Sequence, residues 1–296
     1  MIKEIRATIC LFLTSLIWGI SFVAQVVGMD YMRPFTFNGV SFLIGAVSLV
    51  PVILIFDKEK LDAGERKKLW RYGVICGLIL FAAGNFQQFG VEMTLSAGKS
   101  GFITGLYIII VPIAGIFMKR RAGLLTWTGA LFAVAGMYFL TVPEALGAPE
   151  PGDWMLFTGA FFWAAHIIAI DKFAPHVSSL KLSQAQFIIC GALCMVFAFA
   201  TETIVPALLV AAAVPLLYRG IGSIGIAYTL QIFGQRYVAP AKAAVIFSLE
   251  SVFAVIGGAI LIHEVMTGRA YFGCVLIFCG IILSQIRIKQ QKNTQP

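Results

Sequence analysis

The stretch ATICLFLTSLIWGISFVAQVV, residues 7–27, decides how the rest of the chain is interpreted. It contains no charged residue. A bilayer core about 30 Å thick needs roughly 20 apolar residues in one helix. The stretch is too long for the apolar core of a signal peptide, and it lacks an Ala-x-Ala cleavage site. We therefore predict that it is an uncleaved first membrane span.

Nine further apolar runs follow, and the composition agrees with them. Of the 296 residues, 59% are hydrophobic and 12% are charged, whereas soluble domains have about 45–50% apolar and about 25% charged residues. Soluble enzymes, nucleic-acid-binding proteins, disordered chains and disulfide scaffolds are therefore excluded. We predict an all-α membrane protein with ten transmembrane helices, at 7–27, 35–56, 72–91, 98–117, 124–142, 154–170, 183–203, 213–233, 243–262 and 270–286.

The basic residues predict the orientation of these helices. When the N-terminus is placed in the cytoplasm, all but four of the 22 lysines and arginines fall on the cytoplasmic side. The four on the outer side are Arg33, Lys99, Arg219 and Arg269. Cytoplasmic loops of membrane proteins are enriched in Lys and Arg. We therefore expect a multi-pass protein of the plasma (inner) membrane with both termini cytoplasmic, and we read the +8 charge as topology rather than nucleic-acid binding.

The two halves of the chain resemble each other at an offset of about 143–145 residues. The matching pairs are Trp18 with Trp163, Gln88 with Gln231, Lys99 with Lys242, Gly129 with Gly273, and Gly136 with Gly280. Because five spans is an odd number, the second copy must be inverted relative to the first. We expect a first five-helix repeat at 1–148 and a second, inverted repeat at 149–296, within one membrane domain. Such repeats are typical of transporters, whose substrate site lies near the bilayer midplane.

Several short motifs are similar to those of a known family. They are Trp18-Gly19, Gly152-Asp153, Trp163-Ala164, Leu249-Glu250, His263-Glu264 and Gly273. With them the chain resembles the drug/metabolite transporter superfamily, in particular its ten-span EamA type. Ser41, Ser251 and Arg120 depart from that family's pattern. The resemblance implies a carrier, not an enzyme, that moves amino acids, drugs or other small metabolites, mostly outward.

Glu250 is the most notable polar residue within a span. It lies eight residues after Lys242, which is about 12 Å along a helix at 1.5 Å per residue and therefore close to mid-membrane. One interpretation is a proton-coupling or cation-binding site. The other is a neutral acid that is hydrogen-bonded to neighbouring helices. Its partner in the repeat is Tyr107.

Other polar and aromatic residues fall on matching helix faces. One face carries Asn85, Gln88 and Glu92, and the positions 143 residues later carry Tyr228, Gln231 and Gln235. These faces predict a shared cavity, although interhelical hydrogen bonding is the alternative. Mid-span tryptophans offer walls for a flat or cationic solute, or simply bulky packing. We predict a cavity lined by Trp18, Asn85, Gln88, Tyr107, Trp163, His166, Tyr228, Gln231 and Glu250.

Small residues are assigned to packing. The six cysteines all lie in apolar runs, without a CxxC spacing, and we expect neither disulfides nor a metal site. Gly101 and Gly105 form a GxxxG pattern that allows close helix approach. The two glycine pairs spaced by seven residues are expected to pack the fifth span against the tenth. The basic segment 57–71 is interpreted as a loop that sets topology.

The predicted function is a secondary active transporter that exports a small organic solute by alternating access, with Glu250 as the candidate proton site. One alternative is an antiporter of phosphorylated or nucleotide-linked metabolites; it requires cations in the cavity, and Lys99 and Lys242 lie at helix ends. The other is an intramembrane enzyme, for which only Glu250 with His166 offers a catalytic pair. We expect no catalytic residue, metal or cofactor, and the expected partners are a small solute and membrane lipid. The chain is expected to be a monomer or a weak homodimer.

Overall fold

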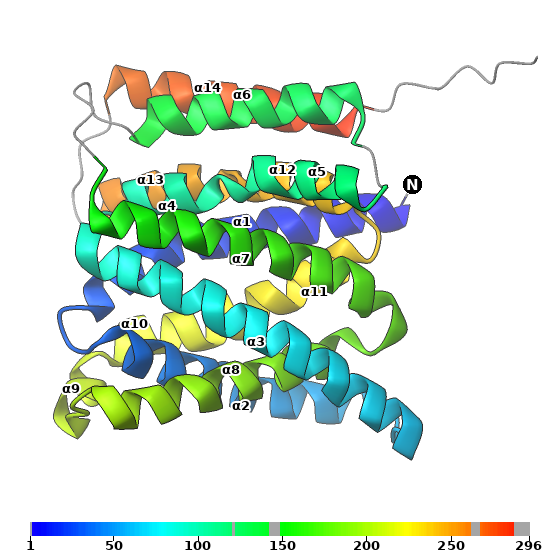
Figure 1. Cartoon of the computed structure of the whole chain (residues 1–296), viewed down its shortest axis with the longest axis vertical. Helices are drawn as coiled ribbons and strands as arrows, with labels where there is room; N and C mark the ends of the chain where they lie inside the picture. Colours follow the sequence, from blue (N-terminus) through cyan, green and yellow to red (C-terminus); the bar gives the residue numbers. More distant parts are fainter. Residues whose placement is uncertain (1, 120–121, 142–148, 262–266, 287–296) are drawn as a thin grey trace, which may run out of the picture.

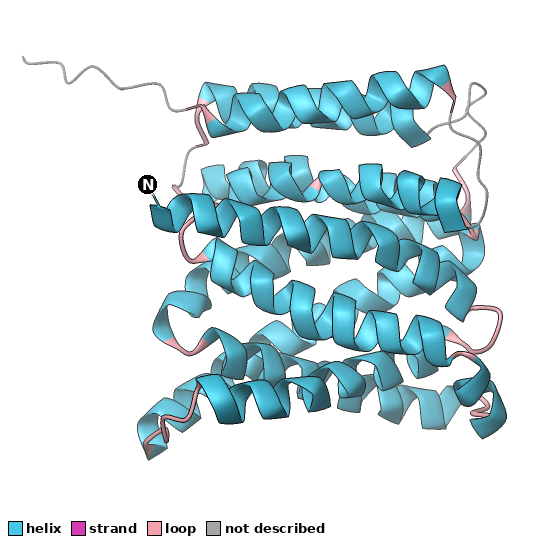
Figure 2. Cartoon of the chain, turned by 180° about the vertical axis from the view of Figure 1, so that it is seen from behind, coloured by secondary structure: helices cyan, strands magenta, loops and turns pink. Residues whose placement is uncertain are grey.

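The structure is a computed structural model that describes residues 2–119, 122–141, 149–261 and 267–286. Within these ranges every regular element is a helix, and no strand is present (Figure 2). Arg120, the His263-Glu264 motif and the C-terminal tail 287–296 lie outside the described residues. The prediction of an all-helical chain is therefore confirmed for the part of the chain that the structure describes.

The first half of the chain forms six helices, whose apolar character agrees with the predicted spans. They are α1 (Ile2–Gly28), α2 (Pro34–Phe56), α3 (Ala63–Thr94), α4 (Ala97–Gly105), α5 (Tyr107–Phe117) and α6 (Leu124–Thr141). The predicted fourth span, 98–117, is divided between α4 and α5 at Leu106.

The second half repeats this order with one more irregular region. Its helices are α7 (Pro151–Phe173), η1 (Ala174–His176), α8 (Ser179–Thr201), α9 (Pro206–Ala211), α10 (Ala213–Leu217), η2 (Tyr218–Tyr228), α11 (Thr229–Gln235), α12 (Pro240–Phe247), α13 (Leu249–Leu261) and α14 (Gly268–Gln285). The ninth predicted span is divided at Ser248, close to the position equivalent to the Leu106 break.

Among the described residues, seven helical stretches are long and apolar enough to cross a membrane. Two shorter apolar helices, at Leu124–Phe139 and Gly268–Ser284, lie where the fifth and tenth spans are predicted. The remaining predicted span, 213–233, is not one regular helix. It consists of α10, η2 and α11, and η2 is π-helical over its eleven residues. The segment is helical throughout, but its backbone hydrogen bonding differs from that of an α-helix, which side-chain periodicity does not reveal.

The basic segment 57–71 is also more ordered than a loop. Asp62 accepts a hydrogen bond from the backbone of Glu65, and Glu65 bonds back to the backbone of Asp62. This reciprocal cap starts α3 at Ala63, well before the predicted start of the third span at residue 72. Arg66, Lys67, Lys68 and Arg71 therefore lie on the first turns of a long helix, whereas Lys58 and Lys60 lie in the connection before it.

One edge of the bundle is made by α6 and α14, which lie side by side at the top of Figure 1. A Cβ placed on Gly129 would lie 2.4 Å from the carbonyl oxygen of Gly280, and a Cβ on Gly136 would lie 2.6 Å from that of Gly273. The two backbones are thus in direct contact, as the glycine spacing predicts. Because the lower-numbered glycine of α6 meets the higher-numbered glycine of α14, these two helices run antiparallel.

The opposite edge is made by α2 and α8 (Figure 1), which hold each other at both ends. Asp57 follows the end of α2 and binds Ser178 and Lys181 at the start of α8. Glu202 follows the end of α8 and binds the backbone of Phe35 and Thr36 at the start of α2. The end of each helix therefore meets the beginning of the other, and this pair is also antiparallel.

The six cysteines are all free, as expected from their apolar surroundings. Gly101 and Gly105 of α4 lie close to α13, where the hydroxyl of Ser251 donates to the carbonyl oxygen of Gly101 at 3.2 Å. The GxxxG pattern of the fourth span therefore marks a close helix contact, as predicted.

Candidate functional site

A cavity lies between the two edges of the bundle, where helices from both halves of the chain meet. Its empty volume is about 440 Å³, including the part that opens to solvent. The side chains that line it come from α1, α3, α4, α5, α7, η2, α11 and α13. They are Trp18, Ser21, Phe22, Gln25, Gln87, Thr104, Tyr107, Trp163, Ile167, Arg219, Ser223, Tyr228, Gln231 and Glu250.

Three aromatic side chains form one wall of the cavity. The ring centroids of Trp18 and Tyr228 are 4.8 Å apart, and those of Trp163 and Tyr228 are 6.1 Å apart. The indole nitrogen of Trp18 donates to the carbonyl oxygen of Ser223 at 3.2 Å, which fixes this ring against η2. Such a wall suits stacking or cation–π contact with a solute.

The carboxyl group of Glu250 is buried in the lining of the same cavity. The hydroxyl of Tyr107 donates to Oε1 of Glu250 at 2.8 Å, and Glu250 is only 4% exposed. Tyr107 is the first residue of α5, and Glu250 is the second residue of α13. Each therefore lies directly after the point where its predicted span is divided into two helices. The predicted equivalence of these positions thus corresponds to a direct hydrogen bond between the two halves.

Several polar atoms around the cavity have no hydrogen-bond partner within the described part of the chain. They are Ser21 Oγ, Thr104 Oγ1, Trp163 Nε1, Arg219 Nε and both polar atoms of the Gln231 amide. Buried polar groups in proteins are nearly always hydrogen-bonded, because leaving one unpaired costs about 1–3 kcal/mol. A cluster of such atoms facing one cavity is typical of a site that binds a polar molecule.

The structure brings together six of the nine residues predicted to line this cavity, namely Trp18, Tyr107, Trp163, Tyr228, Gln231 and Glu250. It places the other three one layer further out. Asn85 donates to the carbonyl oxygen of Phe81, Gln88 donates to that of Gln25, and His166 Nε2 shares a hydrogen bond with Gln186. His166 contacts the rings of Trp163 and Tyr228 in an edge-to-face arrangement. Gln88 contacts the cavity wall through its hydrogen bond to Gln25.

The two predicted polar faces are divided between the cavity and interhelical contacts. Glu92 forms an ion pair with Arg33 at 3.2 Å, and Gln235 donates to the carbonyl oxygen of Ile167 at 3.0 Å. In the fourth span, Thr104 and Tyr107 line the cavity, whereas Ser100 bonds to Thr94 at 3.0 Å. Interhelical hydrogen bonding therefore accounts for the outer members of each face.

Two lysines considered for anion binding lie elsewhere. Lys99 pairs with Glu150 at 3.1 Å and with Asp153 at 2.8 Å, at the start of α4 and α7. Lys242 lines a separate cavity of about 810 Å³ between α5, α7 and α12.

Sequence reasoning missed Arg219, which is the clearest addition to the site. We assigned it to the outer surface, but it is 4% exposed and lines the cavity from η2. Among the described residues, this leaves Arg33, Lys99 and Arg269 of the four basic residues that were predicted to lie on the outer side. The signal was present, because Arg219 falls inside the predicted span 213–233 rather than beside it. Gln87 and Gln25 were also missed; Gln87 Nε2 donates to Gln25 Oε1 at 2.7 Å on the cavity surface.

Comparison with known proteins finds relatives that are similar over nearly the whole chain. The chain is 29% identical to an uncharacterized transporter of Archaeoglobus fulgidus, over 97% of this chain and 88% of the relative. It is 23% identical to the uncharacterized transporter YoaV of Bacillus subtilis, over 94% of this chain and 96% of the relative. A crystal structure of a protein with 19% identity shares the fold, with a TM-score of 0.77 over 94% of this chain and 96% of that chain.

Residues 5–142 and 150–285 each match the same family of transporters, so the internal similarity seen in the sequence is a true duplication. The cavity is lined from both matched regions, and α1, α3, α4, α5, α7 and α13 around it belong to stretches that are long and apolar enough to cross a membrane. This chain is a multi-pass membrane transporter that belongs to the EamA-like transporter family.

Proposed function

We propose that this protein is a secondary active transporter that exports a small organic solute by alternating access, and that the central cavity binds the solute. The observation that carries the proposal is the set of unpartnered polar atoms that face the cavity from both repeats. A solute at this position would satisfy donors and acceptors from both halves at once. Relative movement of the two halves would then change which side of the membrane it can reach.

We propose a topology of ten spans in two inverted repeats, with the first at 1–148 and the second at 149–296. Seven long apolar stretches, the two shorter helices α6 and α14, and the irregular region α10–η2–α11 together support the count. The inversion is supported by the antiparallel packing of α6 with α14 and of α2 with α8, because each pair occupies equivalent places in the two repeats.

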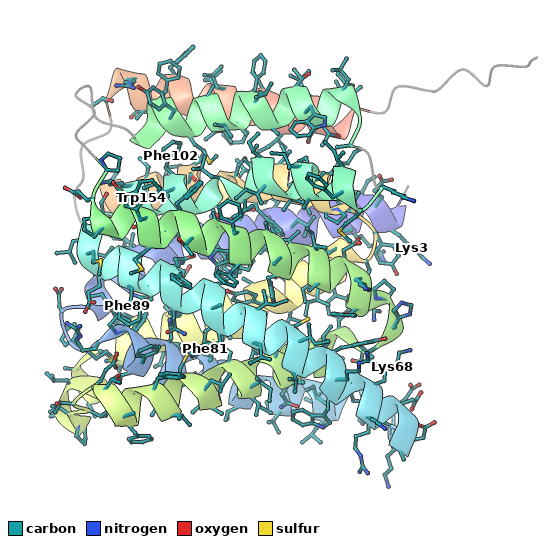
Figure 3. The ribbon with its side chains drawn as sticks, in the orientation of Figure 1. Lys3, Lys68, Phe81, Phe89, Phe102 and Trp154 are labelled. Atoms are coloured by element: carbon teal, nitrogen blue, oxygen red, sulfur yellow. The ribbon has the colours of Figure 1, made fainter. Side chains whose placement is uncertain are left out.

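We propose that the protein lies in the plasma (inner) membrane with both termini in the cytoplasm. Lys3 on α1 and Lys68 on α3 are both exposed and lie toward the same end of the bundle (Figure 3). Basic residues concentrated at one end support its assignment as cytoplasmic. Solute and membrane lipid are the proposed partners, and the proposed assembly is a monomer or a weak homodimer.

In this orientation the cavity lies near the middle of the spans. Gln87 on α3 lies toward the proposed outer side, whereas Ile167 on α7 and Gln231 on α11 lie toward the proposed cytoplasmic side. At the proposed cytoplasmic end, Asp57 pairs with Lys181 at 3.0 Å, and the guanidinium of Arg236 donates to the carbonyl oxygens of Ala174 and Val177. These contacts support a state that is closed at the cytoplasmic end.

Glu250 is proposed as the proton-coupling residue. Its carboxyl group is buried, lines the cavity and bonds to Tyr107 of the other repeat. An acid at this depth is costly when ionised and unpaired, so solute binding and proton binding at this place are expected to influence each other. The hydrogen bond also joins the two broken helices, so a change in the carboxyl group's charge acts where the repeats meet.

Reconstituted protein tests this proposal. Solutes are first selected by thermal-shift screening against amino acids, nucleosides, vitamins and organic cations. In proteoliposomes, wild type is expected to show both solute counterflow and accumulation driven by a pH gradient. Glu250→Gln is expected to retain counterflow and lose the gradient-driven accumulation, whereas Glu59→Gln, an exposed acid outside the cavity, behaves as wild type. Unchanged proton-driven accumulation in Glu250→Gln removes this residue from coupling, and an absence of flux for any solute rejects the transporter proposal.

The alternative of an antiporter for phosphorylated or nucleotide-linked metabolites is favoured by one observation, the guanidinium of Arg219 in the cavity. Against it, Lys99 is occupied by two acids, and Lys242 lies in a different cavity. An intramembrane enzyme has less support, because His166 bonds to Gln186 while Glu250 bonds to Tyr107, so the two do not form a pair.

A further inference from the structure

Arg219 is a cation that the fold buries beside the proposed solute. It lies on the π-helical segment η2, is 4% exposed and lines the cavity. Charged side chains within a membrane protein are costly, and those that persist usually face a polar pathway and act there. Irregular π-helical segments likewise concentrate at functional sites.

The protein holds this guanidinium without neutralising it. Nη2 of Arg219 donates to Oδ1 of Asn38 at 2.9 Å, and the guanidinium lies 5.4 Å from the centre of the Phe37 ring. Both partners are uncharged. None of the carboxylates in the described ranges forms an ion pair with Arg219, and its Nε is buried without a partner there. The positive charge therefore remains available to a ligand in the cavity.

A second layer fixes the orientation of the supporting amide. Nδ2 of Asn38 donates to the carbonyl oxygen of Gly84 and to Oδ1 of Asn85, both at 3.1 Å. Asn85 in turn donates to the carbonyl oxygen of Phe81 at 2.7 Å. Because both amide protons of Asn38 are used, its oxygen must face Arg219. The guanidinium is thus preorganised by α2 and α3, and this gives Asn85 a positioning role.

We propose that Arg219 binds a carboxylate of the transported solute, which makes the substrate class a small organic acid or amino acid with an apolar body. This inference rests on the proposed transport function and names the chemistry of its substrate. A guanidinium presents parallel N–H donors that match the two oxygens of a carboxylate. The adjoining wall of Trp18, Trp163 and Tyr228 suits the apolar body.

The charge of the cavity argues for a monoanion rather than a phosphate dianion. Among its lining residues, Arg219 is the basic one and Glu250 is the acidic one, so the cavity offers a single guanidinium to an anion. A dianion would meet a single cation and a nearby carboxyl group. A monocarboxylate meets one fork of donors, and an amino group on the same solute would face an acid.

Purified full-length protein in detergent tests the inference through the fluorescence of its tryptophans, two of which line the cavity. The probes are matched pairs: phenylalanine and phenylalaninamide, leucine and leucinamide, and 3-phenylpropionate and 3-phenylpropionamide. Because a hydrogen bond to a charged group contributes about 1.5–3 kcal/mol, wild type is expected to bind at least one acid roughly tenfold or more tightly than its amide. Glucose 6-phosphate is the phosphorylated probe.

The variants separate charge recognition from folding. Arg219→Gln is expected to bind the acid and its amide within about threefold of each other, while amide binding itself stays near the wild-type value and reports that the cavity is folded. Arg219→Lys keeps the charge without the planar fork and is expected to retain part of the preference. The matched control is Arg33→Gln, whose side chain is 65% exposed and pairs with Glu92; it is expected to behave as wild type.

Three results would overturn the inference while leaving transport intact. They are equal binding of acids and amides by wild type, an undiminished preference for acids in Arg219→Gln, and Arg219-dependent binding of glucose 6-phosphate alone. If Arg219→Gln does not fold, the acid–amide comparison in wild type and in Arg219→Lys decides the question. Counterflow of an uncharged solute that does not depend on Arg219 supports the exporter and rejects the carboxylate site.

Discussion

Glu202 follows α8, yet its carboxylate caps a helix of the other repeat. Oε1 accepts from the backbone nitrogen of Phe35 at 2.9 Å, and Oε2 accepts from the backbone nitrogen and the hydroxyl of Thr36, both at 2.7 Å. An anion at a helix N-terminus is stabilised by the unpaired N–H groups and by the helix dipole. We expect Glu202→Gln to lose about 1–3 kcal/mol of stability, because it removes the charge from these three bonds. The measurement is the unfolding midpoint in detergent.

The control for this change is Glu59→Gln, since Glu59 is exposed and lies at the opposite end of the α2–α8 pair. It is expected to leave the midpoint unchanged. Equal midpoints for Glu202→Gln and wild type would mean that the cap contributes nothing measurable and that Glu202 is only a surface acid.

For single residues, the sequence predicts the residue types that line the cavity. It predicts less well which of two adjacent residues faces the cavity. Gln87 lines the cavity while the adjacent Gln88 bonds to the backbone of Gln25, and one residue of helical rotation separates the two outcomes. The internal repeat matched Gln88 with Gln231, whereas in the structure the neighbouring Gln87 is the one that lines the cavity. Arg219 was missed because the count assigned every basic residue to one side of the membrane and did not consider a basic residue buried within a span.

Packing of α6 against α14 depends on backbone contact at glycines. A Cβ added to Gly280 would lie 2.5 Å from the carbonyl oxygen of Gly129. Because that oxygen belongs to the backbone, it cannot avoid the new Cβ by rotating about a side-chain bond. The two helices must therefore move apart. Overpacking of this kind costs about 1–3 kcal/mol, more than the gain of up to about 1 kcal/mol that alanine offers over glycine in a helix. We therefore expect Gly280→Ala to lower the unfolding midpoint in detergent.

Gly268 on the same helix provides the matched control for this change. Nothing lies within 4 Å of the Cβ that Gly268→Ala would add. Its midpoint is expected to equal or exceed that of wild type, because only the helix propensity changes. If both alanine variants have the same midpoint, the close contact between α6 and α14 is not a source of stability.

Apolar periodicity and glycine spacing predict the helices and their contacts, but not the places where helices break. The breaks at Leu106 and Ser248 bring Tyr107 and Glu250 within a hydrogen bond, and this bond depends on the packing of two helices distant in sequence. The π-helical form of η2 has no counterpart in α3, the equivalent element of the first repeat. Such irregularities arise from tertiary contacts, which a single-sequence pattern does not contain.

For the whole molecule, the proposed orientation in the membrane depends on the unequal number of basic residues at the two ends of the bundle. Because Arg219 is buried and does not count toward either end, the difference between the two ends is larger than the sequence predicts. Without Arg219, the described cations of the proposed outer side are Arg33, Lys99 and Arg269, and Arg33 and Lys99 are paired with acids. The internal repeat in the sequence predicts the two halves. The contacts between the halves at the cavity, such as the hydrogen bond from Tyr107 to Glu250, can be seen only once the helices are packed together.

Labelling of single cysteines by a membrane-impermeant maleimide in intact cells checks this orientation. The connection after α1 carries the exposed Asp30, and the connection after α2 carries the exposed Lys60. In a background with the exposed Cys279 replaced by serine, Asp30→Cys is expected to label in intact cells. Lys60→Cys is expected to label only after permeabilisation, because its segment is basic and is therefore proposed to be cytoplasmic. The reverse pattern would place both termini outside, and labelling of both sites in intact cells would contradict a membrane span at α2.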